Sequence, residues 1–233
     1  MRIVIFGAGR VGASVAAFAA SLGHEVAALS RADKSRADSE VARADVIAAA
    51  IPDDALESWH EAWRDRLSGK RAFHFSGARA IKGLPGYHPL YSFPKTPLAA
   101  AQFGTIAIAR EPGAAPFSAI IPGANNPEVA VAAEDRAFYH ALAVVSGNFA
   151  AHLWNETAAA FADRLGPNGG EILSAYFASV VDRFRESPLA SMMGPVARRD
   201  AGTVEANLKA LETSPRLHAL YEAFLQSAWP GRG

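Results

Sequence analysis

Cysteine is absent from the 233-residue sequence, which excludes disulfides, cysteine-ligated metal sites and thiol nucleophiles. Neither sign of charge is in excess, because 23 Lys and Arg residues balance 23 Asp and Glu residues. This balance gives no indication of a nucleic-acid or membrane-surface partner. No apolar run approaches the ~20 residues of a membrane-spanning helix, and the residues before Gly7 are too few for a signal peptide. We therefore expect a soluble, cytoplasmic protein.

The motifs of two enzyme classes are also missing. The seven histidines show neither H-x-x-x-H nor H-E-x-x-H spacing, so we predict no metal site. No G-x-S-x-G sequence occurs, so nothing indicates a hydrolase with a serine nucleophile.

The first half of the chain alternates short apolar runs with helical segments, which is typical of an α/β fold with a parallel sheet. The predicted strands are 2–6, 25–29, 46–51, 72–75, 105–109 and 118–121. The predicted helices are 10–22 and 55–67, with a loop and a short helix in 30–45. Prolines and glycines predict long loops at 83–97 and 112–127.

The pattern changes near residue 133. Beyond it the sequence predicts helices at 135–165, 171–185, 203–211 and 216–228. We therefore expect two domains, an α/β domain at 1–133 and a smaller, all-helical domain at 134–233.

A glycine loop joins the first strand to the first helix. Its sequence is Gly7-Ala8-Gly9-Arg10-Val11-Gly12, or G-x-G-x-x-G. The first glycine allows a tight turn, the second lets backbone approach a pyrophosphate, and the third lets helix and strand pack closely. The alternative is a glycine-rich turn that binds nothing. The context favours a dinucleotide-binding Rossmann domain, whose cofactor-binding residues would include Ile51 and Pro52 after the third strand.

The end of the second strand indicates which dinucleotide fits. NAD sites commonly place an acidic residue there to hold the ribose hydroxyls. Here the strand ends at Ser30 and Arg31, and the nearest acid, Asp33, lies beyond it. A hydroxyl and a guanidinium suit a 2′-phosphate, so we favour NADP over NAD. The alternative is a solvated basic loop.

Several further segments carry a family resemblance. These segments are the glycine loop, 51–54, 74–78, 88–90, 92–94, 139–141, 146–148, 194–198, Asp200 and Thr203. With them the chain resembles the Rossmann-like proteins with a helical C-terminal domain of unknown function. These belong to the wider group of pyrroline-5-carboxylate reductase, deazaflavin-dependent NADP reductase and 6-phosphogluconate dehydrogenase. The resemblance implies a helical domain that forms a homodimer.

Two positions depart from the resemblance. Relatives carry a helix after the fifth strand, whereas 111–126 is too rich in glycine and proline for a long one. Hydroxyacid dehydrogenases of the wider group place a lysine one turn before the asparagine that matches Asn148. Val144 stands there, which disfavours β-hydroxyacid oxidation and leaves imine-type reduction open.

Two polar residues on the predicted helix after residue 134 are candidates for catalysis. Asn148, which begins a polar stripe with His152 and Glu156, is expected to bind substrate in the nicotinamide cleft. His152 and Glu156 themselves are expected to form a local pair or a dimer contact. His140 is either a general acid or a satisfied histidine at the domain joint.

Three more candidates lie elsewhere. Ser76 ends the fourth strand, where it either hydrogen-bonds nicotinamide or substrate, or caps the next helix. His88 lies between prolines and suits a ligand or subunit contact. Arg198 either holds a substrate carboxylate or pairs with Asp200, and Asp200 or Thr203 is expected to cap the next helix.

Together these features predict an NADP(H)-dependent oxidoreductase that acts on a small carbonyl, imine or alcohol. Two alternatives remain. One is a dinucleotide-binding sensor or scaffold without turnover, and the other is a structural dimer whose glycine loop is empty.

Overall fold

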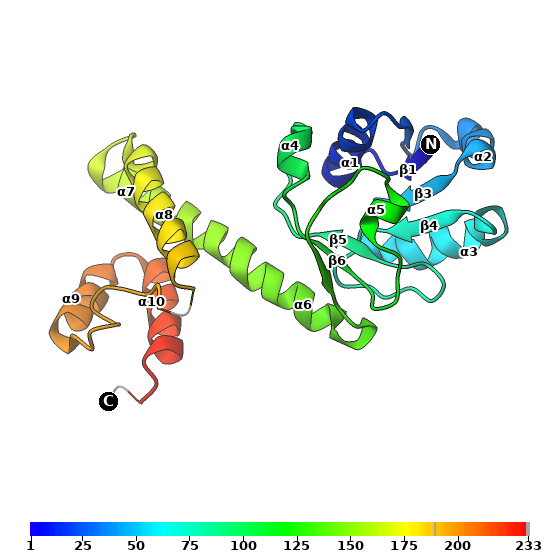
Figure 1. Ribbon diagram of the computed structural model, residues 1–233. Helices are drawn as coiled ribbons and strands as arrows, with labels where there is room; N and C mark the ends of the chain where they lie inside the picture. The colour runs from blue at the N-terminus through cyan, green and yellow to red at the C-terminus, as the bar shows by residue number, and fades with distance from the viewer. Residues whose placement is uncertain (189, 232–233) are drawn as a thin grey trace. The chain divides into compact units, whose positions relative to one another are not determined.

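The computed structural model describes residues 1–188 and 190–231. The chain forms two compact units, Met1–Gly147 and Asn148–Gly233, whose elements are labelled in Figure 1. No helix in the described part of the chain is both long enough and apolar enough to cross a membrane.

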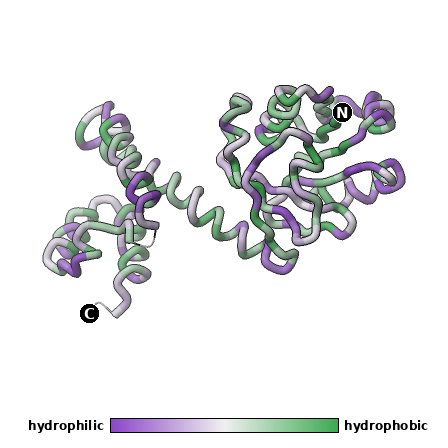
Figure 2. Tube along the Cα trace, in the orientation of Figure 1, coloured by the Kyte–Doolittle hydropathy of each residue, from purple (hydrophilic) through white to green (hydrophobic). Residues whose placement is uncertain are grey.

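A four-stranded parallel sheet in the order β2-β1-β3-β4 forms the centre of the first unit. Its strands are β1 (Arg2–Phe6), β2 (Glu25–Leu29), β3 (Val46–Ala49) and β4 (Arg71–His74). β3 is completely buried, as expected for a strand whose two faces are both covered. The hydropathy colouring of Figure 2 shows hydrophobic residues along these strands. The expected parallel α/β sheet is confirmed.

Alternate residues of β1 belong to two different cores, because successive side chains of a strand point to opposite faces. Ile3 and Ile5 belong to a core with Val15 and Phe18 of helix α1 (Arg10–Ser21). Val4 and Phe6 belong to a second core, which also contains residues of α2 (Lys34–Arg43) and α3 (Leu56–Leu67). A short 3₁₀ turn, η1 (Asp53–Ala55), precedes α3.

A second, three-stranded sheet in the order β5-β6-β7 belongs to the same unit. Its strands are β5 (Tyr87–Pro89), β6 (Ile108–Arg110) and β7 (Glu128–Ala130). β5 and β6 are antiparallel, whereas β6 and β7 are parallel. A single bridge between His74 and Gly86 connects this sheet to β4.

The second sheet corrects several predictions. The strand predicted at 105–109 is β6, which begins later and lies outside the main sheet. The strand predicted at 118–121 is wrong, because Pro116 starts the short helix α5 (Phe117–Ile120) there. The loops predicted at 83–97 and 112–127 contain or adjoin β5 and β7, which are too short to show an alternating pattern. Another short helix, α4 (Ala100–Phe103), precedes β6.

The chain becomes helical after β7 and the turn η2 (Ala133–Asp135). The next elements are α6 (Arg136–Ala143) and a π-helical segment, η3 (Val144–Phe149). The compact units divide after Gly147, later than the domain boundary expected near residue 133. The physical reason is that α6 packs against the strands of the first unit, through contacts described below.

The second unit is all-helical, as predicted. Its helices are α7 (Ala150–Leu165), α8 (Gly169–Glu186), α9 (Ala201–Leu211) and α10 (Pro215–Ala228). Gly169 lets α7 and α8 approach closely, since a Cβ there would lie 2.6 Å from the backbone nitrogen of Ala162. Val196, Val204 and Leu225 form a small core around α9 and α10.

A substitution at Gly12 should destabilise the first unit. A Cβ on Gly12 would lie 1.9 Å from the carbonyl oxygen of Gly7, a backbone atom that cannot move without distorting the loop. We expect Gly12→Ala to lower the free energy of unfolding by about 1–3 kcal/mol, as overpacking does. Urea denaturation followed by circular dichroism measures this. Gly9→Ala is the matched control, because no atom lies within 4 Å of a Cβ at Gly9. Equal losses in the two variants would contradict the steric account.

Candidate functional site

The glycine loop has the geometry of an anion-binding turn. Gly7 has a φ of 107°, and a Cβ there would lie 2.1 Å from the carbonyl oxygen of Ala50, so both the conformation and the space require glycine. Gly9 is the N-cap of α1 and faces open space. The first turn of α1 contains no acidic residue, and no side chain caps it. Its free N–H groups and positive dipole end therefore suit a phosphate group.

A hollow of about 1130 Å³ opens beside this loop. It is lined by the ends of β1, β2 and β3 together with residues of α2 and α3. Part of its wall is aromatic, because the Phe6 ring lies 5.1 Å from Trp59 and 4.9 Å from Trp63, centroid to centroid. Both the size and the apolar lining fit the adenosine part of a dinucleotide.

Charged side chains surround the end of β2 in this hollow. Asp33 accepts hydrogen bonds from the backbone nitrogen and hydroxyl of Ser30, which hold the pKa of its carboxyl below the usual range. Asp38 pairs with Arg66 at 2.7 Å. The side chains of Arg31 and Lys34 line the hollow without a hydrogen bond or ion pair among the described residues.

Most of the predicted cofactor-binding residues meet at this hollow. Those that line it are Gly7, Ala8, Gly9, Ser30, Arg31, Ile51 and Pro52. Arg10, Val11 and Gly12 belong instead to the first turn of α1. Trp59 and Trp63 were missed, because apolar residues at helical spacing are more often ordinary core residues. The donors and the space present here fit a dinucleotide.

A second polar group gathers at the carboxyl end of β4. Gly77 follows this strand, and a Cβ there would lie 2.7 Å from Cδ2 of His140 and 3.0 Å from Nε2 of His88. Nδ1 of His88 lies 2.9 Å from the hydroxyl of Tyr139. Three side chains from β5 and α6 therefore converge beside Ser76 and Gly77. Sequence reasoning named His88 and His140 but assigned no role to Tyr139.

A buried arginine connects α6 to this strand end. Arg136 is completely buried, and its Nη2 donates a 2.8 Å hydrogen bond to the carbonyl oxygen of Ser76. Its Nη1 lies 3.8 Å from Glu111. Burial lowers the pKa of the guanidinium, while the Glu111 carboxylate raises it. No local sequence pattern indicates that this arginine, the first residue of α6, is buried.

Two histidines near Arg136 are held neutral. Burial lowers the pKa of His74 to about 3 and that of His88 to about 4, and the positive charge of Arg136 acts in the same direction. Nδ1 of His74 accepts a hydrogen bond from the backbone nitrogen of Ser76. His74 thereby helps to fix the residues that follow β4.

The hydroxyl of Ser76 is already engaged as an acceptor. The backbone nitrogens of Ala78 and Arg79 donate to its Oγ at 3.3 and 3.0 Å. This resembles the predicted capping role, although a turn rather than a helix follows. The hydroxyl proton remains available to a ligand, so its catalytic assignment stays a prediction.

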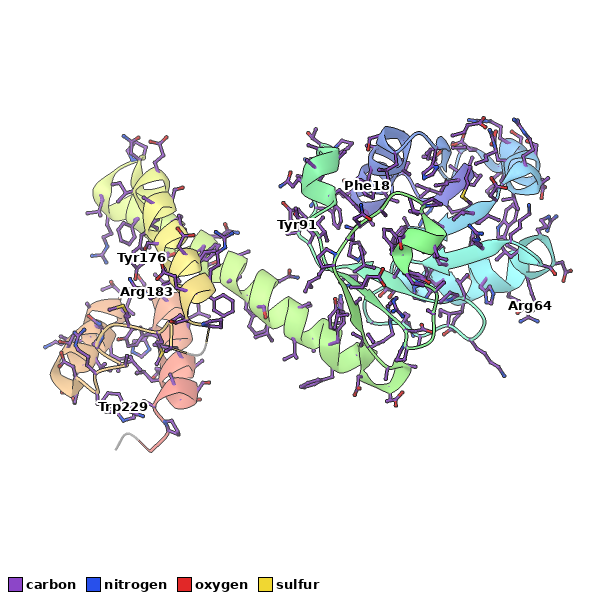
Figure 3. All side chains as sticks on the ribbon, in the orientation of Figure 1. Phe18, Arg64, Tyr91, Tyr176, Arg183 and Trp229 are labelled. Atoms are coloured by element: carbon purple, nitrogen blue, oxygen red, sulfur yellow. The ribbon has the colours of Figure 1, made fainter. Side chains whose placement is uncertain are left out.

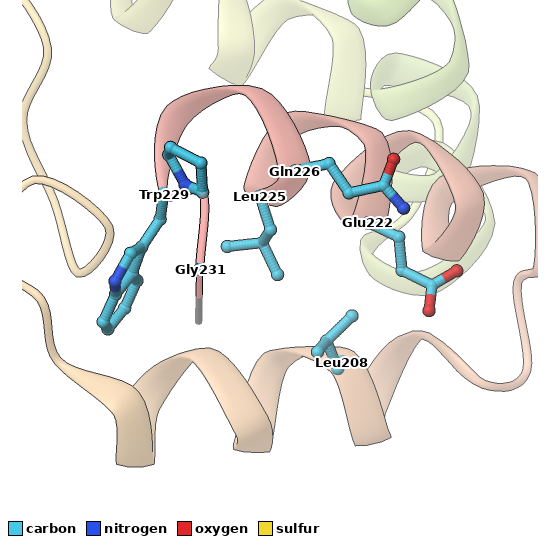
Figure 4. Close-up of a pocket in the computed structure, with 7 residues that line it drawn as sticks. Leu208, Glu222, Leu225, Gln226, Trp229 and Gly231 are labelled. Carbon is cyan, nitrogen blue, oxygen red and sulfur yellow. The ribbon is translucent and has the colours of Figure 1, made fainter. Parts of the chain in front are cut away.

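No group of three or more His, Asp or Glu residues within 1–188 and 190–231 has a metal-binding arrangement. A smaller hollow of about 360 Å³ lies in the second unit between α9 and α10 (Figure 4). It is lined in part by Leu208, Glu222 and Gln226. None of the predicted site residues lines it.

Comparison with known families decides the classification of the chain. Residues 107–228 match the model of a domain of unknown function, DUF2520, over more than half of the chain. The chain belongs to the DUF2520 family. The resemblance inferred from the sequence segments is therefore confirmed. A comparison with curated proteins gave no match.

Solved structures share the fold of this DUF2520 protein at low sequence identity. A suggested NADP oxidoreductase from Bacteroides fragilis has a TM-score of 0.73 and 18% identity over 97% of both chains. A protein from Thermotoga maritima has a TM-score of 0.70 and 21% identity, over 97% of this chain and 96% of that one. Pyrroline carboxylate reductase from Plasmodium falciparum, solved with NADP bound, has a TM-score of 0.65 and 11% identity, over 98% and 95%. These similarities show a Rossmann-like fold followed by a helical region.

The remaining predicted residues lie in the second unit of the DUF2520 protein. Asn148 is exposed in the π-helical segment η3, and its role stays a prediction. Glu156 pairs with Arg216 at 3.6 Å. The other expectation, that His152 and Glu156 form a dimer contact, stays a prediction.

The expected cap of α9 is confirmed. Asp200 accepts a hydrogen bond from the backbone nitrogen of Thr203 at 3.1 Å and another from its hydroxyl at 2.7 Å. Hydrogen bonds from Thr203, more than the charge of Arg198, hold the pKa of this carboxyl below its usual range. The assignment of Arg198 to a substrate carboxylate stays a prediction.

The buried histidines should make the protein less stable in mild acid. Their folded-state pKa values, about 3 and 4, lie below the ordinary value of about 6.5, so the unfolded chain binds protons first. The free energy of unfolding should therefore fall as the pH drops below about 6.5. Each histidine should contribute a slope of at most about 1.4 kcal/mol per pH unit. Urea denaturation at pH 7.5, 6, 5 and 4.5 measures this.

The matched variants for this pH test are His74→Gln and His152→Gln. The first removes one buried titrating group and should flatten the decline. The second alters an exposed histidine of α7 and should leave the decline unchanged. A decline that is identical in the wild type and in His74→Gln would contradict the assignment of His74.

Proposed function

We propose that this DUF2520 protein is an NADP(H)-dependent oxidoreductase that acts on a small carbonyl, imine or alcohol. The main observation in its support is that the candidate binding residues all lie along one edge of the parallel sheet. The four strands are parallel, so their carboxyl ends lie on the same side. The glycine loop and the hollow occupy the ends of β1, β2 and β3, and the histidine–tyrosine group follows β4.

The strand order makes this edge suitable for an extended dinucleotide. β2, at one border, carries the free cations Arg31 and Lys34 beyond its end. β1 carries the phosphate-binding loop, and β3 and β4 follow in order. In parallel α/β sheets, ligands bind outside the carboxyl ends of the strands. An adenosine at β2 and a pyrophosphate at β1 would direct the other end of the dinucleotide toward β4.

Different residues of the chain would bind the different parts of the cofactor and the substrate. The N–H groups at the start of α1 would bind the pyrophosphate. Arg31 and Lys34 would bind a 2′-phosphate, with Ser30 oriented by its hydrogen bond to Asp33. Ser76 and His140 would contact the substrate, with His88 beside them. The nicotinamide, when bound, supplies or accepts a hydride.

The charged Asp33 is the feature that opposes this cofactor preference. Its carboxylate lines the same hollow and would repel a phosphate, whereas it would accept hydrogen bonds from ribose hydroxyls. Arg36 offsets part of its charge at 3.1 Å. Two free cations against one partly compensated carboxylate favour NADP, and the P. falciparum reductase, which holds NADP, supports the same choice.

Cofactor titration tests the proposal directly. We expect NADPH to bind more tightly than NADH in isothermal titration calorimetry. Arg31→Ala should weaken NADPH binding by about 10- to 100-fold, the usual loss for a hydrogen bond to a charged group, with little change for NADH. Gly9→Ala should weaken both nucleotides, because its Cβ enters the space left for the phosphates.

Arg64→Ala is the matched control for Arg31→Ala. Arg64 is an exposed arginine of α3 that pairs with Glu61 and does not line the hollow (labelled in Figure 3). Its replacement should leave both affinities unchanged. If neither NADPH nor NADH binds, the proposal is contradicted. Tight NADPH binding, without NADPH oxidation by a panel of carbonyls and imines, would instead favour the sensor function.

We also propose that the protein is a homodimer formed through its helical unit. Ile172, Tyr176, Val180 and Phe184 recur at four-residue intervals on α8 and are between 43% and 63% exposed. Residues at this spacing lie on one face of a helix. A contiguous apolar stripe of this length on a small unit is typical of a protein–protein contact, and a second copy would cover it with an equivalent stripe.

A charge on the α8 stripe should dissociate such a dimer. We expect Tyr176→Asp to shift the molar mass from dimer to monomer in light scattering, because the interface would bury an unpaired carboxylate. Ala178→Asp is the matched control, since Ala178 is exposed on another side of the same helix. A monomeric wild-type protein would contradict the proposal.

A further inference from the structure

The polar group beside Gly77 contains a phenol as well as two imidazoles. Tyr139 and His140 are consecutive residues of α6, whereas His88 belongs to β5. Nδ1 of His88 and Oη of Tyr139 are 2.9 Å apart, and the two rings meet edge to face with their centroids 5.6 Å apart. All three side chains are partly exposed, so solvent or a small ligand can reach the group.

We propose that Tyr139 donates the proton that a carbonyl or imine requires during reduction, and that His88 resupplies that proton. The inference rests on the proposed oxidoreductase function, because a reduction by hydride needs a proton donor at the neighbouring oxygen or nitrogen. Tyr139 would be the catalytic acid. His88, acting through Tyr139, would be a positioning and relay residue.

The glycine at position 77 fixes the place of this pair. A Cβ on Gly77 would lie 3.0 Å from both Cδ2 and Nε2 of His88 and 2.7 Å from Cδ2 of His140. Both rings therefore touch the backbone at the end of β4, where a Rossmann-like sheet leaves room for ligands. The absence of a side chain at this position is what allows the imidazoles to approach.

The buried guanidinium of Arg136 anchors the helix that carries Tyr139. Arg136 lies one turn before His140 on α6 and donates to the Ser76 carbonyl oxygen at 2.8 Å. The same bond connects α6 to the residue that precedes Gly77. The phenol is consequently held at the strand end by a contact other than its own hydrogen bond.

The protonation states of Tyr139 and His88 at neutral pH suit a tyrosine that donates a proton. Burial raises the pKa of Tyr139, so the phenol keeps its proton at neutral pH. The pKa of His88, lowered to about 4 mainly by burial, leaves the imidazole neutral with a single N–H. A neutral imidazole is a far weaker acid than a phenol. Of the two hydrogen-bonded partners, Tyr139 is therefore the one able to release a proton to a substrate.

The surrounding charges favour the same assignment. Arg136 lowers the pKa of Tyr139 against the effect of burial, because its positive charge stabilises a phenolate. Arg136 and His140 both act to lower the pKa of His88. On the side of β6, Glu111 lies 3.8 Å from Arg136, and Asp53 of η1 also interacts with this guanidinium. These anions act on the pKa of the arginine, whereas the charge of Arg136 acts on the pKa of the phenol.

The proton balance closes with water as the final source. As the substrate carbon gains a hydride, its oxygen or nitrogen gains an electron pair and forms a bond to the proton of Oη. The O–H bond of Tyr139 breaks in the same step. Nδ1–H of His88 then returns a proton to Oη, while Nε2 takes one from water. Tyr139 regains its proton, and the water is left as hydroxide. His88 is left with its proton on Nε2 and returns to the Nδ1–H tautomer by exchanging protons with water, and the substrate has gained one hydride and one proton.

Turnover measurements on the full-length chain test the proposal. The probe is NADPH together with the fastest-reduced member of a panel of small aldehydes, ketones and cyclic imines. We expect Tyr139→Phe to lower kcat by about 10²- to 10⁴-fold, the usual contribution of a general acid. Its KM and its NADPH affinity should stay close to those of the wild type. His88→Gln should lower kcat less, because water can still reprotonate Tyr139.

Tyr91→Phe is the matched control. Tyr91 is an exposed tyrosine of the same unit (labelled in Figure 3), and its hydroxyl accepts a hydrogen bond from Gln102 rather than contacting His88. Removal of the Tyr91 hydroxyl should leave kcat unchanged. An unchanged kcat in Tyr139→Phe would overturn the inference while the oxidoreductase function stands. A wild type that binds NADPH but reduces no probe would overturn both.

The pH profile separates a phenol donor from an imidazole donor. With Tyr139 as the acid, kcat of the wild type should be level from about pH 6 to pH 9. A histidine donor of ordinary pKa would instead lose rate as the pH rises through about 6.5. A decline of that kind, retained in Tyr139→Phe, would overturn the assignment of the proton donor to Tyr139.

Nitrogen-15 NMR of the histidine rings gives a readout without turnover. Tyr139→Phe should shift the Nδ1 resonance of His88, whereas Tyr91→Phe should not. The His88→Gln spectrum assigns that resonance. An unchanged Nδ1 resonance in Tyr139→Phe would mean that the pair is not formed in solution, and it would overturn the inference independently of any substrate.

Discussion

The hydrogen bond from the buried guanidinium of Arg136 to the carbonyl oxygen of Ser76 is the contact on which the candidate site depends. A buried charge is costly unless it is paired or hydrogen-bonded, and here a backbone oxygen and the nearby Glu111 offset part of that cost, although Nε and Nη1 have no hydrogen-bond partner among the described residues. The bond joins the first residue of α6 to the end of β4. It thereby brings Tyr139 and His140 to the strand end where His88 also lies.

The same contact explains where the first unit ends. A division at the last strand would leave α6 with the helical unit. Arg136, Tyr139 and His140 instead attach α6 to strands of both sheets, so the compact unit continues to Gly147. The polar group at the end of β4 consequently consists of residues from a single unit. Tyr139, His88 and the strand end that they contact therefore all belong to the first unit.

The sequence predicted the main sheet because its strands are short, buried and bounded by glycine, proline or charged residues. It also predicted the glycine loop between β1 and α1, because Gly7 and Gly12 of G-x-G-x-x-G stand where the structure leaves no room for a side chain. The second sheet was missed because a strand of three residues, such as β5, is too short to display a period of two. Arg136 was missed for another reason. Its burial depends on Ser76, a residue 60 positions earlier in the chain, and a local pattern carries no trace of such a contact.

The three-stranded sheet also bears on how the family segment can be separated from the rest of the chain. The DUF2520 match begins at residue 107, just before β6, whereas the partner strand β5 ends at Pro89. A fragment cut at the family boundary would keep β6 and β7 and lose β5, leaving one side of β6 with unpaired N–H and C=O groups. It would also lose His88 and the Ser76 carbonyl that receives Arg136. The family boundary therefore cuts through the first unit, and a fragment designed to keep the three-stranded sheet intact has to include the strand β5 that precedes it.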